Sequence, residues 1–221
     1  MEKEITGIVI KKTAIHEYDA FVKVLSKEGI VDLYCKGVNK PESKNRNALN
    51  LLDVSNFEIF IPKDNQFNHR LKRATLIKQF PYDSNLLNIQ TQLLHWFNLI
   101  KSENCELLIE WYIELNKYWK TNKDYKIYTF LLFKILQAEG INPYLNGCVE
   151  CNKTEDIVSF ALYKGGYLCQ KHAINQPIMN VGILKSLFYL DKTFELYASN
   201  VSHEDNKTIF KLIIEYLTEL I

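Results

Sequence analysis

Four residues able to bind a metal ion form two short motifs in the second half of the chain. Cys148 and Cys151 are separated by two residues in CVEC, and Cys169 and His172 have the same spacing in CQKH. Seventeen residues lie between the two motifs. A two-residue spacer folds into a tight turn that points both side chains at one ion. The sequence therefore predicts a metal site with three thiolates and one imidazole.

We expect this site to bind one Zn²⁺ and to support the fold, because three Cys and one His fill the tetrahedral coordination of zinc and leave no open position. The intervening IVSFALYKGGYLC alternates and contains a Lys-Gly-Gly turn, which predicts a β-hairpin that returns the second motif to the first. A cluster without metal and a redox pair are the alternatives. A zinc deaminase is excluded, since no His-x-Glu precedes a Pro-Cys-x-x-Cys.

Other catalytic motifs are missing from the sequence. It contains no G-x-x-x-x-G-K-S/T, G-x-G-x-x-G or G-x-S-x-G. Asp and Glu are scattered over expected helix surfaces, and His95 beside Trp96 is typical of packing. Cys35 and Cys105 occur singly in apolar segments and are expected to be buried. We therefore expect a protein that is not an enzyme and has no small-molecule substrate.

The composition predicts a globular protein of the cytoplasm. The chain has 221 residues, of which 47% are hydrophobic and 24% are charged. No apolar run approaches the roughly 20 residues that cross a bilayer, and the acidic start MEKEITGIVIKKT is unlike a signal peptide. Residues 1–80 carry 14 Lys and Arg against 10 Asp and Glu, whereas the remainder carries 13 against 16. The basic first part favours an anionic partner such as nucleic acid, and no membrane partner is expected.

The first 80 residues predict a small β-barrel or sandwich. Five β-branched or alternating runs, separated by turn residues, cover residues 7–12, 19–26, 30–37, 54–62 and 69–80. The expected inward faces carry Ala20, Val22 and Val24, then Val31, Leu33 and Cys35, and then Phe57, Ile59 and Ile61. Between the third and fourth strands, KGVNKPESKNRNALN is polar and basic and is expected to be a mobile loop.

Helical periodicity begins after Pro81. One helix is expected to start at Asp83 or Ser84, a second to carry apolar residues from Leu108 to Trp119, and a third to cover about 124–139. Two more helices are expected to finish the chain, the last one capped by Ser202 with Asp205 three residues later. The predicted class is α+β, with a β domain at 1–80 and an all-helical domain at 81–221 that carries a zinc-ribbon-like insert at about 145–175.

The N-terminal stretch GIVIKKTAIHEYDAFVKVLSKEGIVDLYCKGVNKPESK resembles the opening of the bacterial RecO family of DNA recombination and repair proteins. That opening runs from a G-I-V-L strand through an acidic E-x-D turn to a K-G-x-x-x-P-x-S basic loop. The matching residues here are Gly7–Ile10, Glu17 and Asp19, and Lys36–Ser43. The likeness continues at GINPYLNGCVECNK and FALYKGGYLC, and it covers most of the chain.

The resemblance implies an N-terminal five-stranded OB-fold, a helical domain and a zinc-binding insert. It also implies binding of single- and double-stranded DNA, annealing of complementary strands and partnership with RecR. Further implied roles are binding of the acidic C-terminal tail of single-strand-binding protein and help in loading RecA onto coated strands, which places the protein at the bacterial nucleoid. The sequence departs from the family where His172 replaces a common cysteine, and in a basic loop with only one arginine, Arg46.

An OB barrel binds single strands through a cationic groove with aromatic side chains that stack on bases. Tyr34 is on the same strand face as Lys36 and is a candidate to stack on a base, or it is simply a rim aromatic. For each cation alone, a solvated surface charge is the alternative. The candidate cations are Lys11, Lys12, Lys23, Lys36, Lys40, Lys44, Arg46, Arg70, Lys72 and Arg73.

Two hypotheses of different classes follow. The first is a non-enzymatic mediator of DNA repair and recombination that binds DNA directly. The second is a zinc-ribbon adapter that acts chiefly through protein contacts, with its β domain docking a partner peptide, and that has no direct role on DNA. Salt-dependent binding of single-stranded DNA distinguishes them, because only the mediator must release counterions from phosphates.

Overall fold

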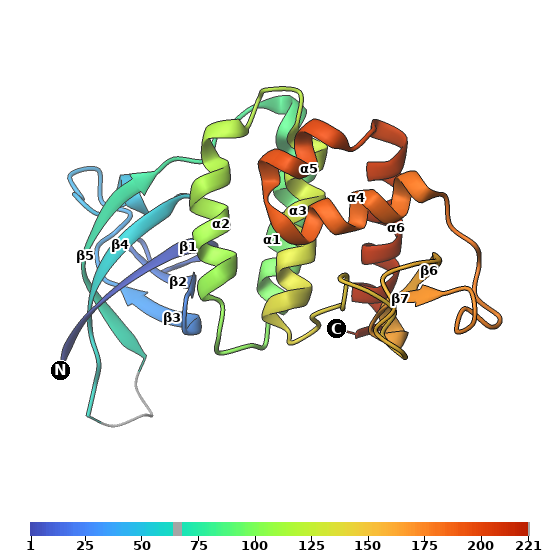
Figure 1. Cartoon of the computed structure of the whole chain (residues 1–221). Coiled ribbons are helices and arrows are strands. Elements are labelled where there is room, and N and C mark those ends of the chain that lie inside the picture. Colours follow the sequence, from blue (N-terminus) through green and yellow to red (C-terminus); the bar gives the residue numbers. More distant parts are fainter. Residues whose placement is uncertain (64–67, 221) are drawn as a thin grey trace. The chain divides into compact units, whose positions relative to one another are not determined.

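The computed structural model describes residues 1–63 and 68–220, and the chain forms two compact units, Met1–Trp119 and Lys120–Ile221. The first unit contains a β-barrel and two helices, and the second contains four helices and a two-stranded hairpin (Figure 1). Among the described residues, every helix is too short or too polar to cross a membrane.

Five strands close the barrel of the first unit, as the sequence predicts. They are β1 (Glu2–Ile15), β2 (Asp19–Ser26), β3 (Gly29–Cys35), β4 (Val54–Phe60) and β5 (His69–Lys78), joined in the order β1-β2-β3-β5-β4. All neighbours are antiparallel except β3 and β5, which are parallel. Closure removes the open strand edges that a five-stranded sheet would otherwise expose. The OB-type barrel predicted for the N-terminal domain is therefore confirmed.

The interior of the barrel follows the predicted alternation. Because successive side chains of a strand point to opposite faces, the residues that pack inside leave their sequence neighbours outside. The inward set includes Ala20, Val22, Val24, Leu33, Cys35, Phe57 and Ile59, with Val31 and Ile61 packed against it. Cys35 is buried, and this burial raises the pKa of its thiol to about 12. Cys105 is buried as well, so both isolated cysteines behave as small hydrophobic residues, as expected.

The basic segment between β3 and β4 is more ordered than a mobile loop. Val38, Ala48 and Leu49 are buried in the barrel core, and a 3-10 helix, η1 (Arg46–Ala48), forms near its end. The side-chain oxygen of Asn45 accepts a hydrogen bond of 3.0 Å from the backbone N–H of Ala74 on β5. The expectation of a mobile loop overlooked these three apolar residues, whose burial fastens the polar stretch to the barrel.

Two helices complete the first unit. They are α1 (Leu87–Leu99), preceded by η2 (Ser84–Leu86), and α2 (Glu106–Leu115), followed by η3 (Asn116–Tyr118). The Asp83 side chain accepts a hydrogen bond from the backbone N–H of Asn85, so the helical region starts where predicted. The last barrel strand ends at Lys78, two residues before the boundary predicted after residue 80, whereas the first compact unit extends through both helices to Trp119.

The second unit is mainly helical. It contains α3 (Asp124–Ala138), the strands β6 (Ile157–Ala161) and β7 (Gly166–Cys169) with η4 (Leu162–Lys164) between them, and then α4 (Val181–Lys192), α5 (Phe194–Asn200) and α6 (His203–Leu220). Residues 127–136 of α3 are all buried, so this helix forms the centre of the unit. Three helices end the chain where two were expected, because extended Thr193 breaks the run and caps α5. Ser202 accepts from the N–H of Asp205, as predicted.

Candidate metal centre and nucleic-acid interface

A β-hairpin brings the two metal-binding motifs together, as the sequence predicts. β6 and β7 are antiparallel, and Cys169 at the end of β7 pairs with Ile157. Gly166 has a φ of +145°, and a Cβ there would lie 2.2 Å from the carbonyl oxygen of Tyr144. Glycine is thus required for the segment before Cys148 to approach the hairpin this closely. Just beyond Cys148, the backbone N–H of Val149 donates to the Tyr167 carbonyl at 2.8 Å.

The four predicted ligands form one compact cluster. Their ligand atoms all lie within 4.8 Å of one another. His172 Nδ1 is 3.4 Å from the Sγ atoms of both Cys148 and Cys169, and Cys151 Sγ is 3.8 Å from Cys169 Sγ. Thiolates and an imidazole arranged tetrahedrally at about 2.0–2.3 Å from one ion would be separated by roughly 3.5–3.8 Å. The cluster therefore fits one tetrahedrally coordinated metal ion.

The surroundings of Cys148 favour a thiolate, the form that binds metal. Burial by itself raises the pKa of this thiol. Hydrogen bonds from the backbone at Cys169, Glu150 and Cys151, together with the His172 ring, outweigh the burial and lower the pKa to about 6. Cys148 and Cys169 are buried, whereas Cys151 is exposed, so the cluster lies at the edge of the hairpin. The cluster offers four protein ligand atoms, the number that tetrahedral coordination of one metal ion requires.

The candidate nucleic-acid residues occupy three places on the first unit. Lys12 points to the other side of β1 from its neighbour Lys11, because it pairs with inward-facing Val22 on β2. Burial lowers the pKa of Lys12, and its charge interacts with Cys35 and Arg46. A second group lies on the segment between β3 and β4 and comprises Lys40, Lys44 and Arg46. The third group belongs to the strands or the end of β3 and comprises Lys11, Lys23, Tyr34, Lys36, Arg70, Lys72 and Arg73.

Neighbouring carboxylates partly neutralise some of these cations. Lys23 lies 3.8 Å from Asp32, and Lys72 lies 2.7 Å from Glu2 and 3.7 Å from Glu58. Arg73 lies 4.0 Å from the same Glu58. Within residues 1–63 and 68–220, by contrast, no carboxylate lies within 4.0 Å of the cationic groups of the other seven candidates, which are Lys11, Lys12, Lys36, Lys40, Lys44, Arg46 and Arg70. Lys12 is half-buried, so the six exposed side chains of this set have the charge most available to an anionic ligand.

Tyr34 is held in place by Asp19, which belongs to the E-x-D turn singled out in the sequence. The Tyr34 hydroxyl donates to one oxygen of Asp19, and the backbone N–H of Gly37 donates to the other at 2.7 Å. These two hydrogen bonds lower the pKa of Asp19. Lys40 Nζ lies 5.5 Å from the centre of the Tyr18 ring on the same turn. Asp19 therefore fastens the start of the basic segment to the turn between β1 and β2.

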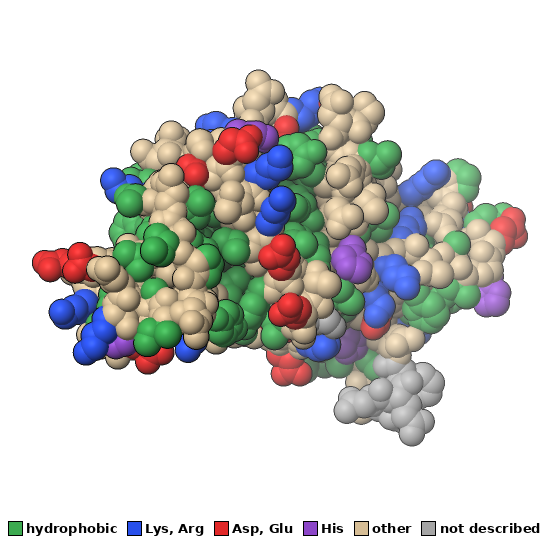
Figure 2. All heavy atoms as spheres, turned by 90° about the vertical axis from the view of Figure 1, so that its right-hand side faces the viewer, with side chains coloured by type: hydrophobic (Ala, Val, Ile, Leu, Met, Phe, Trp, Pro, Cys, Tyr) green, Lys and Arg blue, Asp and Glu red, His purple; other side chains and the backbone are tan. Residues whose placement is uncertain are grey.

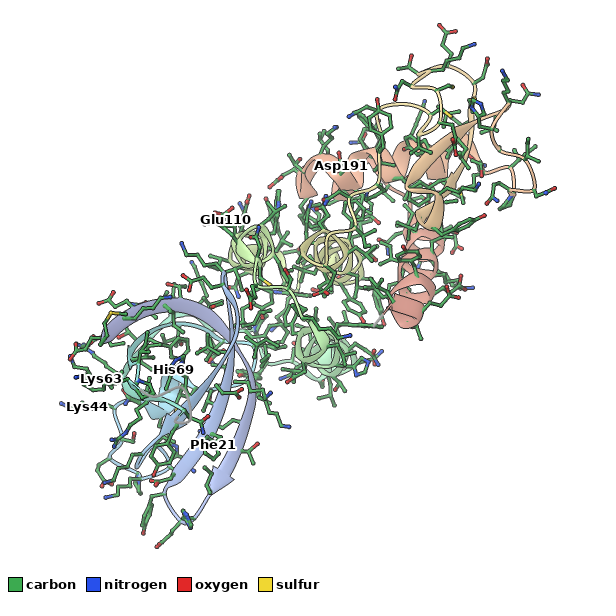
Figure 3. All side chains as sticks on the ribbon, turned by 90° about the horizontal axis from the view of Figure 1, so that it is seen from below. Phe21, Lys44, Lys63, His69, Glu110 and Asp191 are labelled. Atoms are coloured by element: carbon green, nitrogen blue, oxygen red, sulfur yellow. The ribbon has the colours of Figure 1, made fainter. Side chains whose placement is uncertain are left out.

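Two exposed aromatic residues on the barrel escaped the sequence reasoning. Phe21 is 39% exposed, and its ring centre is 5.8 Å from that of Tyr34; Phe60 is 42% exposed. Figure 3 labels Phe21 on the barrel together with Lys44. The signal for Phe21 was present in DAFVKVLS, where it falls on the polar face with Asp19 and Lys23.

Comparison with known proteins supports one family over both units. The model described as "Recombination protein O N terminal" matches residues 1–80, and the model "Recombination protein O C terminal" matches residues 120–221. A protein from Mycoplasma capricolum named DNA repair protein RecO is 30% identical over 230 aligned positions, covering 98% of this chain and 91% of that protein.

Two further relatives with the same name extend the match. The protein from Mycoplasma mycoides is 31% identical and covers all of this chain and 93% of its own length. The protein from Bacillus cytotoxicus is 24% identical over 99% of this chain and 92% of its own length. Three observations point to the same family: the closed five-stranded barrel, the cluster of four ligand residues at the hairpin of the helical unit, and the two family models, which match in the same order along the chain. The chain belongs to the recombination protein O (RecO) family.

Proposed function

We propose that this protein is a mediator of DNA repair and homologous recombination that binds single- and double-stranded DNA directly. The observation that carries the proposal is the set of six exposed cations, Lys40 among them, that have no carboxylate partner among the described residues of the barrel and its basic segment; the same unit exposes Phe21 and Phe60. Cations in such a place neutralise phosphates and release counterions, and aromatic rings stack on unpaired bases.

Annealing and loading are the activities proposed for this DNA-binding surface. A protein that neutralises the phosphates of two complementary strands lowers their repulsion, so annealing requires no nucleotide hydrolysis and the protein is proposed not to be an enzyme. Membership in the family supports further proposals: partnership with RecR, binding of the acidic C-terminal tail of single-strand-binding protein, and help in loading RecA on coated strands. The proposed place of action is the bacterial cytoplasm, at the nucleoid.

The metal proposed for the cluster is one Zn²⁺ per chain. Three thiolates and an imidazole suit zinc, and Cys148, Cys151, Cys169 and His172 would hold it. When bound, the ion would join the segment before β6 to the turn after β7. Its proposed role is structural, because four protein ligands leave no position for a reactant.

The adapter hypothesis is favoured by a specific surface of the second unit. A cavity of about 420 Å³ is lined by the apolar side chains of Val181, Leu184 and Phe188 on α4. Lys185 of the same helix also lines it. Ile174 and Ile178, on the segment before α4, are 72% and 82% exposed. Hydrophobic side chains also stand among charged ones of both signs on the face seen in Figure 2. Such apolar surface is typical of protein contacts, and it is compatible with a mediator that also binds DNA.

Binding of a fluorescently labelled single strand, measured by anisotropy over a range of salt concentrations, tests the proposed function. Each phosphate neutralised contributes about 0.7 to the log–log salt slope for a single strand. Replacing Lys40, Lys44 and Arg46 together by Glu should weaken binding to strands of any sequence and flatten the slope by about one unit or more. The fold should persist, because exposed charge substitutions cost under about 0.5 kcal/mol.

The matched control reverses two exposed lysines of α6, Lys207 and Lys211, which should leave both affinity and slope unchanged. If the unmodified protein binds single strands without any salt dependence, the mediator proposal fails and the adapter hypothesis stands. If the unmodified protein binds with the expected salt dependence and the triple variant has the same affinity and salt slope, the basic segment is a solvated surface. DNA then follows another path on the barrel.

A further inference from the structure

A single row of outward-facing side chains crosses four strands of the barrel. In the strand register, Phe21 of β2 is paired with Tyr34 of β3, Tyr34 with Arg70 of β5, and Arg70 with Phe60 of β4. Directly paired residues point to the same side of a sheet. Their sequence neighbours Ala20, Leu33 and Ile59 point into the core, so the four members of the row face outward. Three aromatic rings and one guanidinium are thus placed side by side by the fold.

The rings of this row keep open surface for a ligand. Phe21 and Phe60, at its two ends, are 39% and 42% exposed, although apolar rings on a monomer are usually buried. Between them, Tyr34 is fixed by its hydroxyl bond to Asp19 and stands at 57° to the Phe21 ring. Lys72 Nζ lies 5.7 Å from the centre of the Phe60 ring. The row is therefore a partly rigid aromatic surface with one cation, Arg70, between its rings.

The charge around the row matches a polyanion that carries planar groups. Arg70 lies within the row and has no carboxylate within 4.0 Å among the described residues. Lys36, two positions from Tyr34 on the same strand face, adds a cation on one side of the row, whereas Lys23, two positions from Phe21 on the other side, is partly neutralised by Asp32 at 3.8 Å. A guanidinium also stacks on aromatic and base planes, in addition to binding phosphate.

The length of the row suits several nucleotides. Strands are about 4.8 Å apart, so the three strand-to-strand steps from Phe21 to Phe60 span roughly 14 Å. Stacked nucleotides rise about 3.4 Å along one strand, so this span matches a stretch of a few nucleotides. Single barrels of this type bind roughly 4–16 nucleotides, and the row would hold the centre of such a site.

We propose that Phe21 and Phe60, with Tyr34 and Arg70 between them, stack on the unpaired bases of single-stranded DNA, and that this row makes the barrel bind single strands more tightly than duplex. The inference rests on the proposed function, since it deepens the DNA site of the barrel. In a duplex the base planes are covered by their neighbours, and the rings have nothing to stack on. The cations of the basic segment meet phosphates of both forms alike, so the two parts of the surface are separable by mutation.

The test compares the full-length protein with Phe21→Ala and Phe60→Ala, using a labelled oligothymidine strand and a labelled duplex of the same length. Loss of one base–aromatic stack should weaken single-strand binding about tenfold, equivalent to ~1.4 kcal/mol. Duplex affinity and the salt slope should stay unchanged, and the double variant should lose nearly all preference for single strands. Leu76→Ala, at a residue 39% exposed on β5 and outside the row, is the matched control and should change neither affinity.

Phe21→Trp and Phe60→Trp should restore single-strand binding, whereas Phe21→Leu, which keeps apolar volume without a ring system, should not. The Leu variant also keeps the test decisive if an Ala variant folds poorly by circular dichroism. Failure of the unmodified protein to bind single strands would refute the proposed function itself. If it binds normally but the Phe variants match it, or if they lose single-strand and duplex binding equally, the stacking row is refuted while the DNA-binding function stands.

Discussion

At the scale of single residues, the metal cluster shows how uneven the environments of four ligands are. Cys148 is fully buried, whereas Cys151 is exposed, and His172 is intermediate between them. The His172 ring nitrogen lies 3.4 Å from two of the sulfurs. Without Cys148, two thiols and one imidazole remain, and these provide only three of the four ligands of a tetrahedral site. Cys148 is therefore the position to test.

Cys148→Ser should lose the bound metal, falling from one equivalent of zinc to less than roughly a tenth of an equivalent in metal analysis of purified protein. A hydroxyl is a far weaker ligand than a thiolate for such an ion. Cys105→Ser is the control. Cys105 is also buried, but it lies in the first unit at the start of α2 and is not part of the cluster. Retention of a full equivalent by the Cys148 variant would show that the cluster is not the metal site.

Asp19 is predicted to hold the start of the basic segment through its two hydrogen-bonded oxygens. The folded-state pKa of Asp19 is lowered by the Tyr34 hydroxyl and the Gly37 N–H. This stabilisation is therefore present above the ordinary Asp pKa of about 3.9 and is lost as the pH falls through the lowered folded-state value. Asp19→Ala should expose the Gly37 amide to faster hydrogen exchange at neutral pH.

Two-dimensional NMR measures both effects through the Gly37 amide signal. In the unmodified protein this signal should shift only in the acid range below about pH 4. Asp32→Ala is the matched control. Asp32 forms an ion pair of 3.8 Å with the exposed Lys23 on the barrel surface, so its removal should leave the Gly37 signal unchanged. An unchanged Gly37 amide in Asp19→Ala would mean that other contacts hold the segment.

At the scale of elements, a buried hydrogen bond fastens α2 to the barrel. The Tyr112 hydroxyl donates to the carbonyl oxygen of Leu52 at 2.7 Å, and Leu52 has a φ of +64° just before β4. Next to it, Asp53 accepts from the backbone N–H of Phe80 at 2.8 Å. Burial raises the pKa of Tyr112, so its hydroxyl keeps its proton and remains a donor. The chain segment that enters β4 is thus bound to both the helix and the end of the barrel.

Tyr112→Phe should reduce the free energy of unfolding of the first unit by about 1–3 kcal/mol, because the Leu52 carbonyl would remain buried without its donor. Urea denaturation followed by circular dichroism measures the loss. Tyr82→Phe removes the same kind of bond, a 2.8 Å donation to the Leu51 carbonyl, but from a residue that is 47% exposed. Water can replace that donor, so the control should change stability by less than about 0.5 kcal/mol. Equal losses in the two variants would contradict the argument from burial.

At the scale of the whole molecule, the two compact units divide the proposed tasks. The barrel and its candidate DNA residues belong to Met1–Trp119, and the metal cluster belongs to Lys120–Ile221. Because the ion would hold a hairpin of the second unit only, its loss should be felt mainly there. Isolated zinc-binding modules gain roughly 10–16 kcal/mol from their metal, which is enough to decide whether such a hairpin folds.

Removing the metal from the full-length protein with a chelator at neutral pH should open the hairpin while the barrel persists. Hydrogen exchange followed by mass spectrometry should show lost protection in residues 145–175 and unchanged protection in the strands of the barrel. Single-strand affinity should fall by less than about tenfold, or ~1.4 kcal/mol. Re-addition of zinc should restore protection. A complete loss of DNA binding with an intact barrel would show that the metal unit contributes directly to the DNA site.

The sequence by itself determined most of the elements and the four residues of the candidate metal cluster. Alternation in runs such as DAFVKVLS fixes which side of a strand is apolar, and the two spacings of two residues define Cys148, Cys151, Cys169 and His172 as one set. These are local signals, because burial of a strand face and the turn of a metal-binding motif depend on residues a few positions apart. The closed barrel and the cluster followed as expected.

Only the tertiary structure decided which of the surface residues act together. Lys11 and Lys12 are neighbours in sequence, yet strand pairing points Lys12 toward the barrel interior. Lys72 forms ion pairs with carboxylates of two other strands, at Glu2 and Glu58. Phe21 and Phe60 are joined into one row only through the pairing of four strands. Strand register and ion pairing couple residues tens of positions apart, and no local pattern encodes that coupling.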